Sequence, residues 1–507
     1  MDVGIIGAGA MGKGIAQVAA VAGHQVVMFD ARGGAAVAAV GRVGQSLDRQ
    51  VEKGRLTASE RDAAAGRLRV ADSLEAFSDC GLVIEAIVED LTVKQAVFAE
   101  LEEVVAEACV LATNTSSLSI GAVCKDLRRP ERSLGLHFFN PPHVMKLVEV
   151  VAGPRTTDAT VEYGVQFARG LGKQPVVARD TPGFIVNLAG RAYTTEALHI
   201  VAEGVATPVQ VDRIMCDNHR FPMGPFELMD LTGVDVNYPV TQNIFEHHFA
   251  EPMLRSTWEH RYHYEAGLLG QKTGRGFHDH TGSAPADTGP AVPPAPGVAP
   301  AVVLGSQDQA LREFCVRNEL RVVEDDGVSA VLVAPVGEDV TLTADRLGLD
   351  LHRTVGVDLA FGAVPVVTVA VPPGVAAELF GPLHGHLAAR QAVEVVNDSP
   401  GFVGQRIIAA VVNLGCQIAQ QGVATPEDID LAVQLGLRYP AGPLALGEQT
   451  GPEVISQILT GMHTTTGDPR YRTSGWLRRR TAARLPLHHP DHANVPHLQL
   501  TRARGDE

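Results

Sequence analysis

The 507-residue sequence is poor in cysteine, in aromatic residues and in positive charge. Its six cysteines are dispersed and form no C-x-x-C pair, so neither a disulfide framework nor a zinc ribbon is expected. Lys and Arg number 42 against 58 Asp and Glu, a formal net charge of −16, which argues against nucleic acid or an anionic membrane as the main partner. No apolar run approaches the roughly 18 residues of a membrane-spanning helix, and the N-terminus lacks the basic start of a signal peptide. Composition therefore predicts a cytoplasmic, multi-domain protein with no metal site, no nucleic-acid partner and no membrane partner.

Short apolar strands alternate with helical stretches in the first part of the chain. The strand-like runs are residues 3–6, 25–29, 82–86, 110–113 and 133–136. Nearly continuous apolar strands between helices are typical of a parallel sheet that is covered on both faces. The long polar insert at residues 32–72 indicates a solvated helical hairpin.

A glycine motif follows the first of these strands. Gly7, Gly9 and Gly12 form G-x-G-x-x-G, with Met11 inside it, and Asp30 ends the second strand. Glycines at these positions allow a tight turn, close approach of a pyrophosphate and packing of the following helix, whose N-terminus attracts the phosphate. A carboxylate at Asp30 would accept a hydrogen bond from the ribose 2′-hydroxyl, which favours NAD over NADP, although Arg32 could partly accommodate a 2′-phosphate. The motif predicts a Rossmann-type dinucleotide-binding domain.

From about Thr181 onward the sequence pattern predicts mainly helices. Thr181-Pro182 and Thr207-Pro208 both predict helix starts, with the hydroxyl as N-cap and proline in the first helical position. Asp180–Phe184 recurs as Asp398–Phe402, an offset of 398 − 180 = 218, and the same offset relates the only two tryptophans, Trp258 and Trp476. The helical domain is therefore predicted to be duplicated.

These patterns predict a fold of the α/β class with a sequential arrangement of parts. We expect a Rossmann-type NAD-binding domain followed by an all-α domain, then a degenerate α/β segment and a second copy of the all-α domain. The predicted bounds are 1–179, 180–282, a Pro/Ala-rich linker 283–300, 301–395, 396–480 and a tail 481–507.

A histidine and a glutamate form the second chemical pattern. His137 ends one strand, and Glu149 lies on the next strand after a turn that contains Asn140 and Pro141. An imidazole in contact with a carboxylate suits a general base for alcohol oxidation. The spacing alone leaves open a merely structural histidine beside a surface glutamate.

The blocks Asn114–Leu118, His137–Pro141, Lys146–Val150 and Asp180–Asn187 together resemble the signature of the L-3-hydroxyacyl-CoA dehydrogenases, in matching order and spacing. The resemblance covers roughly residues 1–280. It implies NAD-dependent oxidation of an acyl-CoA thioester at its 3-hydroxyl. Two-copy members of this size suggest 3-hydroxyadipyl-CoA in phenylacetate breakdown, or 3-hydroxybutyryl-CoA in short-chain β-oxidation, as the substrate.

The same resemblance implies roles for individual residues. His137 would be the base and Glu149 its partner, Ser116 and Asn187 would bind the reacting oxygens of the substrate, and Asn140 would support the site. The implied NAD contacts beyond the glycine loop are Glu89, Lys94, Asn114 and Lys272, and the implied coenzyme A contacts in the insert are Ser46 and Lys53.

The second half departs from this pattern at the chemical positions. Val302–Gln307 lacks the glycine motif, Asp358 stands where histidine is expected, Thr368 or Val369 lies near the place of Glu149, and Gln405 replaces Asn187. We expect a degenerate unit without an active site, so that one chain mimics a dimer of shorter enzymes; further association of whole chains is left open. The alternative functions are a catalytically silent NAD-binding scaffold in a β-oxidation assembly and a dehydrogenase of free hydroxy acids.

Overall fold

The computed structural model describes residues 2–282, 292–294 and 297–491. Much of the predicted linker 283–300 and of the predicted tail 481–507 lies outside these residues. The chain forms two compact units, and each is discontinuous in sequence: Met1–Leu188 groups with Gln421–Leu437, and Ala189–Gln420 groups with Arg438–His489. No helix of the described residues is long and apolar enough to cross a membrane.

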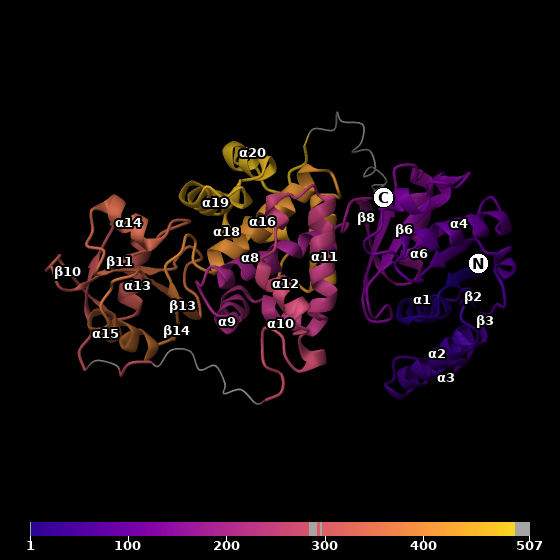
Figure 1. The fold of residues 1–507 in the computed structure, drawn as a ribbon, viewed down its shortest axis with the longest axis horizontal. Helices are drawn as coiled ribbons and strands as arrows, with labels where there is room; N and C mark the ends of the chain where they lie inside the picture. The colour runs from indigo at the N-terminus through magenta and orange to yellow at the C-terminus, as the bar shows by residue number, and fades with distance from the viewer. Residues whose placement is uncertain (1, 283–291, 295–296, 492–507) are drawn as a thin grey trace. The chain divides into compact units, whose positions relative to one another are not determined.

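An eight-stranded sheet forms the centre of the first unit (Figure 1). Its strand order is β3-β2-β1-β4-β5-β6-β7-β8, and all neighbours pair in parallel except β6 and β7, which are antiparallel. The strands are β1 (Asp2–Ile6), β2 (Gln25–Phe29), β3 (Leu68–Val70), β4 (Leu82–Glu85), β5 (Val110–Thr113), β6 (Ser133–Phe138), β7 (Leu147–Ala152) and β8 (Gln174–Arg179). The predicted Rossmann-type sheet is thus present.

Helices connect these strands and cover the sheet. They are α1 (Ala10–Val21), α2 (Ala35–Glu52), α3 (Ala58–Gly66), η1 (Leu74–Phe77), α4 (Leu91–Val104), α5 (Ile120–Val123), η2 (Pro130–Arg132), α6 (Asp158–Gly170), α7 (Val186–Ala189) and α17 (Pro426–Leu437). Helices α2 and α3 form the hairpin expected between residues 32 and 72, and Thr57 and Glu60 close a reciprocal capping box at the start of α3.

The helix start predicted at Thr181-Pro182 is wrong. Gly183 and Phe184 both have positive φ angles, 83° and 48°, so the chain makes a turn here and the helix α7 begins only at Val186. Threonine followed by proline suits the first positions of a turn as well as those of a helix. This turn also contributes to the site described below.

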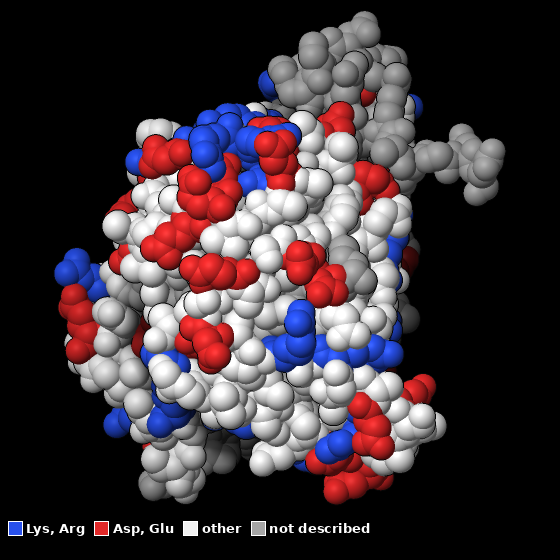
Figure 2. Space-filling view, turned by 90° about the vertical axis from the view of Figure 1, so that its right-hand side faces the viewer, with Lys and Arg blue, Asp and Glu red and all other residues white. Residues whose placement is uncertain are grey.

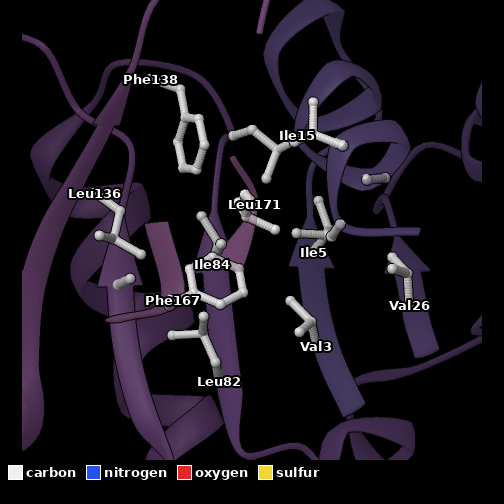
Figure 3. Packing of buried hydrophobic residues seen from close by; sticks show 14 of the residues in the cluster. Val3, Ile5, Ile15, Val26, Leu82, Ile84, Leu136, Phe138, Phe167 and Leu171 are labelled. Carbon is white, nitrogen blue, oxygen red and sulfur yellow. The ribbon is translucent and has the colours of Figure 1, made fainter. Parts of the chain in front are cut away.

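The core of the first unit lies between the sheet and helices α1 and α6. Val3 and Ile5 of β1 and Ile84 of β4 are fully buried, and Ile15 of α1 and Phe167 of α6 pack on them (Figure 3). Each such side chain contributes about 1.5–3 kcal/mol on burial. The core fixes the carboxyl ends of the parallel strands, where a ligand binds in folds of this kind.

The second unit contains a six-stranded sheet in the order β10-β9-β11-β12-β13-β14, with only β12 and β13 antiparallel. The strands are β9 (Ala301–Leu304), β10 (Arg321–Val323), β11 (Ala330–Val333), β12 (Thr354–Val357), β13 (Val366–Val371) and β14 (Ala392–Asn397). Helices α13 (Gln309–Arg317), α14 (Val340–Leu347) and α15 (Ala377–Ala388) accompany this sheet.

The remaining helices of the second unit fall into two series. The first is α8 (Arg191–Ala202), α9 (Pro208–His219), α10 (Pro225–Thr232), α11 (Val234–His247), η3 (Pro252–Leu254), α12 (Trp258–Glu265) and η4 (Gln271–Thr273). The second is α16 (Gly404–Gln420), α18 (Pro443–Thr450), α19 (Pro452–Thr466), η5 (Pro469–Tyr471) and α20 (Gly475–Ala483). Helices α8 and α16 pack against each other. The predicted helix start at Thr207-Pro208 is confirmed, because Thr207 caps α9.

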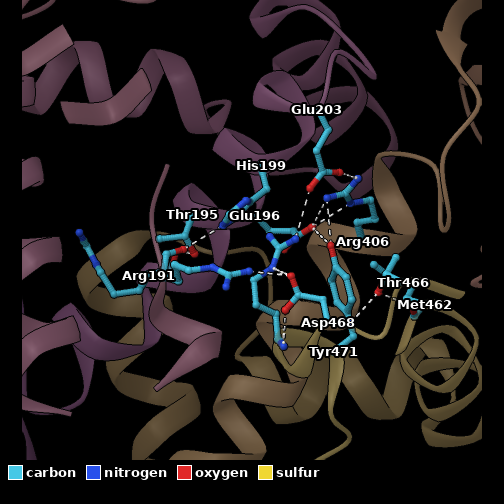
Figure 4. Close-up of polar contacts among 12 residues, drawn as sticks. Arg191, Thr195, Glu196, His199, Glu203, Arg406, Met462, Thr466, Asp468 and Tyr471 are labelled. Carbon is cyan, nitrogen blue, oxygen red and sulfur yellow. Dashed lines mark hydrogen bonds and ion pairs between the residues drawn. The ribbon is translucent and has the colours of Figure 1, made fainter. Parts of the chain in front are cut away.

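A buried ionic network joins α8 to α16 (Figure 4). The guanidinium of Arg406 contacts Glu196 at 2.7 Å and Glu203 at 2.7 Å, and it donates to the hydroxyl of Tyr471 at 3.0 Å. Arg470 contacts the same two carboxylates at 3.4 and 3.2 Å. Arg406 is 1% exposed and Glu196 is 4% exposed, so neither charge has bulk water as an alternative partner.

Replacing Arg406 by leucine should lower the free energy of unfolding by about 3–5 kcal/mol, because it leaves Glu196 charged and buried without its main partner. The double variant Glu196→Leu/Arg406→Leu should recover more than half of that loss, since no unpaired charge is then created at this contact. Urea denaturation of the wild type, both single variants and the double variant gives the coupling. A loss below about 1 kcal/mol in Arg406→Leu would contradict the assignment.

Candidate active site

The glycine loop between β1 and α1 has the shape that a dinucleotide needs. Gly7 has a φ of 105°, and a Cβ atom on it would lie 2.3 Å from the carbonyl oxygen of Ala86. A Cβ atom on Gly12 would lie 1.9 Å from the oxygen of Gly7, whereas nothing lies within 4 Å of a Cβ atom placed on Gly9. Gly7 and Gly12 therefore close the turn, and Gly9 leaves space beside it. No side chain caps the N-terminus of α1 at Gly9, so its first N–H groups suit a pyrophosphate.

Asp30 lies next to this loop, at the end of β2. Its carboxylate accepts hydrogen bonds from the backbone N–H of Ala8 at 2.8 Å and from Arg32 Nε at 2.9 Å. The Arg32 guanidinium holds the pKa of the Asp30 carboxyl well below its ordinary value, so the group is an anion at neutral pH. The loop, the helix end and this carboxylate together fit the NAD expected from the sequence.

His137 and Glu149 lie directly opposite each other on the antiparallel strands β6 and β7. Nδ1 of His137 lies 2.5 Å from Oε2 of Glu149, and the two residues are 6% and 0% exposed. Oε1 of Glu149 accepts the backbone N–H groups of Ile185 at 3.0 Å and Val186 at 2.9 Å. A carboxylate only accepts, so Nδ1 is the donor of this contact, and in the neutral ring the lone pair is on Nε2. The arrangement presents a base held by a fully hydrogen-bonded carboxylate.

The loop after β5 brings Ser116 to the start of the helical segment. Asn187 on α7 donates from Nδ2 to the carbonyl oxygen of Ser116 at 3.4 Å. Asn114 accepts the backbone N–H of Phe138, the residue after His137, at 2.9 Å. Asn140 is exposed in the turn between β6 and β7, where its peptide bond to Pro141 is cis. Ser116, Asn187, Asn114 and His137 thus occupy one region, with Asn140 at its outer turn.

Glu89, in the connection between β4 and α4, holds this loop by hydrogen bonds. Its Oε1 accepts from the hydroxyls of Thr115 at 2.5 Å and Ser117 at 2.9 Å, and from the N–H of Ser116 at 3.2 Å. Burial alone would raise the pKa of Glu89, but the Thr115 hydrogen bond and the charge of Lys94 outweigh burial and lower it. The loop is therefore held in place by an ionised carboxylate.

Lys94 is 1% exposed and pairs with Glu85 at 2.6 Å and with Glu89 at 3.2 Å. Glu85 also accepts from the hydroxyl of Thr113 at 2.7 Å. Sequence reasoning did not single out Glu85, although a glutamate inside an otherwise apolar strand is a signal that could have found it. The structure thus gives Lys94 two carboxylate partners within the protein.

The remaining predicted contacts lie elsewhere in the two units. Ser46 is on α2 and Lys53 is its exposed C-terminal cap, seven residues apart on the hairpin. Lys272 belongs to the second unit, where its Nζ lies 2.5 Å from Oδ1 of Asp235. Within the described ranges, no group of three or more His, Cys, Asp and Glu side chains could hold a metal ion. The face drawn in Figure 2 carries small groups of basic side chains separated by acidic ones.

The corresponding place in the second sheet has different chemistry. Asp358, directly after β12, donates its N–H to the oxygen of Thr368 on β13, and its carboxylate accepts from Nε2 of Gln405 at 2.9 Å. Burial raises the pKa of Asp358 to about 6. Asp358 and Thr368 thus face each other across β12 and β13 as His137 and Glu149 do across β6 and β7, and Gln405 contacts Asp358.

Comparison with known proteins gives consistent matches over nearly the whole chain. Residues 2–181 match the family "3-hydroxyacyl-CoA dehydrogenase, NAD binding domain", and residues 183–280 and 401–486 both match "3-hydroxyacyl-CoA dehydrogenase, C-terminal domain". A 3-hydroxyadipyl-CoA dehydrogenase of Escherichia coli K12 is 38% identical over 484 residues, which cover 94% of this chain and 97% of that protein. A 3-hydroxybutyryl-CoA dehydrogenase of Bradyrhizobium diazoefficiens is 40% identical over 286 residues, which cover 56% of this chain and 97% of that protein.

Solved structures show the same relationship. The crystal structure of a 3-hydroxybutyryl-CoA dehydrogenase from Escherichia coli K12 superposes with a TM-score of 0.84 at 35% identity, covering 95% of this chain and 98% of the other.

Glu149→Gln should move the proton of His137 from Nδ1 to Nε2. The amide oxygen would take over the two backbone N–H groups of Ile185 and Val186, so the amide NH₂ would face Nδ1 and require it to accept. The ¹⁵N chemical shifts of selectively labelled histidine distinguish the two tautomers. Glu149→Asp, which keeps an acceptor, is the matched control and should retain the wild-type tautomer. An unchanged His137 spectrum in Glu149→Gln would contradict this geometry.

Proposed function

Because this chain belongs to the 3-hydroxyacyl-CoA dehydrogenase family, whose reaction is the NAD-dependent oxidation of a 3-hydroxyacyl-CoA to the 3-oxoacyl-CoA, we propose that His137 is the general base of that oxidation. The observation that supports this proposal most is the 2.5 Å contact between Nδ1 of His137 and the buried carboxylate of Glu149. It leaves Nε2 as the only ring nitrogen able to take a proton.

In the proposed mechanism, Nε2 of His137 removes the proton of the 3-hydroxyl. Bound NAD supplies the hydride acceptor for C3. The carboxylate of Glu149 fixes the ring and stabilises the imidazolium that forms, while the N–H groups of Ile185 and Val186 hold that carboxylate in place. Ser116 and Asn187 bind the reacting oxygens, and Glu89 holds the loop that carries Ser116. Asn140 supports the turn beyond His137.

The proposed NAD site in the first unit uses the glycine loop with Met11, Asp30 for the ribose, and Glu89 and Asn114. A role for Lys272, in the second unit, stays a prediction from the family resemblance. Lys94 acts through Glu89 and Glu85, which it contacts. Ser46 and Lys53 remain the proposed coenzyme A contacts on the hairpin. A cytoplasmic location completes this proposal, in keeping with six cysteines that are all free thiols.

We further propose that the helical domain is duplicated and that the second α/β unit has no dehydrogenase site of its own. One domain description matches both 183–280 and 401–486. The N–H of Arg179 donates to the oxygen of Val423, and the N–H of Asn397 donates to the oxygen of Val205. Both residues of one bond are displaced by 218 from those of the other (397 − 179 and 423 − 205). Such reciprocal exchange is what an isologous dimer would show, so one chain stands in for two subunits.

The substrate that we propose first is 3-hydroxyadipyl-CoA, as in phenylacetate or other aromatic breakdown, because the relative of that name aligns with both halves of this chain. 3-Hydroxybutyryl-CoA is the second candidate, after the relative that spans 56% of the chain and the solved structure of that name that covers 95% of it. The adipyl chain is two carbons longer and ends in a carboxylate, so kcat/KM for each substrate separates the two candidates.

His137→Gln should lower kcat by at least roughly a hundredfold, the loss expected when a general base is removed. The test follows NADH formation at 340 nm with 3-hydroxybutyryl-CoA, longer acyl-CoAs and the adipyl form, for the wild type and the variant. Free 3-hydroxybutyrate and L-gulonate serve as substrates that lack coenzyme A. Activity on the free acids alone, or none on any thioester, would reject the proposed function, and a variant with near-normal kcat would reject the base.

Asp30→Ala should raise kcat/KM for NADP relative to NAD by about tenfold or more. It removes an anion that repels the 2′-phosphate and releases Arg32 from its 2.9 Å contact, so that the guanidinium becomes available to a phosphate. Steady-state kinetics with both cofactors measure the ratio. The double variant Asp30→Ala/Arg32→Ala should lose the gain; an equal ratio in wild type and Asp30→Ala would refute the role of Asp30.

A further inference from the structure

Helix α17 comes from the second half of the chain but packs within the first unit. Residues Gln421–Leu437 group with Met1–Leu188, and α17 lies against β7 and β8. Two hydrogen bonds tie the start of this segment to the end of β8: the N–H of Arg179 donates to Val423 O at 2.8 Å, and Nη1 of Arg179 donates to Gln421 O at 3.2 Å. The sheet that carries His137 and Glu149 is thus contacted by residues more than two hundred positions away in sequence.

Gly436, near the end of α17, lies close to α7 and β7. A Cβ atom on Gly436 would lie 2.9 and 3.0 Å from the two Cγ atoms of Val186 and 3.2 Å from Cδ2 of Leu147. These distances leave no room for a methyl group unless Val186 moves. Only glycine lets the helix lie this close.

Both neighbours of Gly436 lie close to Glu149, and one of them is hydrogen-bonded to it. Val186 donates its N–H to Oε1 of Glu149 at 2.9 Å. Leu147 lies two residues before Glu149 on β7, so the two side chains share one face of the strand. Oε2 of the same carboxylate contacts His137 at 2.5 Å. A shift of Val186 therefore reaches the base through a single hydrogen-bonded carboxylate.

We infer that Gly436 is a positioning residue for the His137–Glu149 pair, and that the second half of the chain thereby takes part in catalysis although it carries Asp358 where the first half has its histidine. This inference rests on the proposed function of His137. Packing of α17 would then keep the N–H of Val186 in contact with the carboxylate of Glu149. Packing that only stabilised the fold would not require that the residue in contact with Gly436 also donate a hydrogen bond to Glu149.

The test compares Gly436→Ala and Gly436→Val in the full-length chain. We expect Gly436→Val to lower kcat about tenfold to a hundredfold, as a displacement of about 1 Å does in a catalytic site, with a smaller loss in Gly436→Ala. The acidic limb of the pH–rate profile should shift in both variants, and KM for the acyl-CoA should change little. The additional change Val186→Ala removes the two Cγ atoms in the way, so Gly436→Ala/Val186→Ala should regain most of the kcat lost in Gly436→Ala.

Gly447 on α18 supplies the matched control. It is also a helical glycine in close contact, because a Cβ atom on it would lie 2.6 Å from atoms of Leu487 and Val412, but neither neighbour is bonded to Glu149. Gly447→Ala should lower the Tm and leave kcat per folded molecule and the pH–rate profile unchanged.

The outcomes separate the possible failures. If folded Gly436→Ala and Gly436→Val keep the wild-type kcat and pH–rate profile, or lose activity only in proportion to the unfolded fraction, the inference is overturned. Should Gly436→Val fail to fold, Gly436→Ala and its Val186→Ala rescue decide the question alone. If His137→Gln stays active, the proposed function itself has failed; if His137→Gln is inactive and both Gly436 variants are normal, only the positioning role is lost.

Discussion

A carboxylate with no access to solvent, that of Glu149, is the group on which the rest of the site depends. A buried anion is tolerated only when its lone pairs are satisfied, and here three donors come from two separate parts of the chain. His137 approaches across the antiparallel pair β6–β7, and Ile185 and Val186 approach from the turn that leads into α7. The need to satisfy one carboxylate therefore ties the sheet to the beginning of the helical segment.

Much of this arrangement could be predicted from the sequence because its signals are local. The glycine motif, the strand that precedes it and Asp30 lie within thirty residues. Because β6 and β7 are joined by one turn, the spacing of His137 and Glu149 allowed their contact, although it equally allowed a structural histidine beside a surface glutamate. What could not be predicted depends on contacts between distant segments. The backbone N–H groups of Ile185 and Val186 carry no side-chain signature, and the Thr181-Pro182 pair suited a helix as well as the turn that actually forms.

The second half shows the same limit more strongly. Its departures at Asp358 and Gln405 could be read one residue at a time, and they indicate a unit without dehydrogenase chemistry. No sequence signal in Pro426–Leu437 predicts that this helix packs on β7 and β8 of the first sheet. From sequence alone, a glycine within a helix predicts only a mildly less stable helix. The contact of Gly436 with Val186 can be recognised only in the folded structure, where the two segments are close.

The network of Arg406 and Glu196 has a consequence for the independence of the two halves. Displaced by 218, the positions of Arg406 and Arg470 are held by Leu188 and Pro252, and that of Glu196 by Leu414. If the helical domain is duplicated, two first halves assembled as a homodimer would bury a pair of glutamates opposite leucine and proline, and two second halves would bury arginines opposite leucine. Only the pairing of a first half with a second half brings the buried arginines and glutamates together. The halves are thus complementary rather than interchangeable. Neither half could form a symmetric homodimer by itself unless its buried charged residues were first replaced.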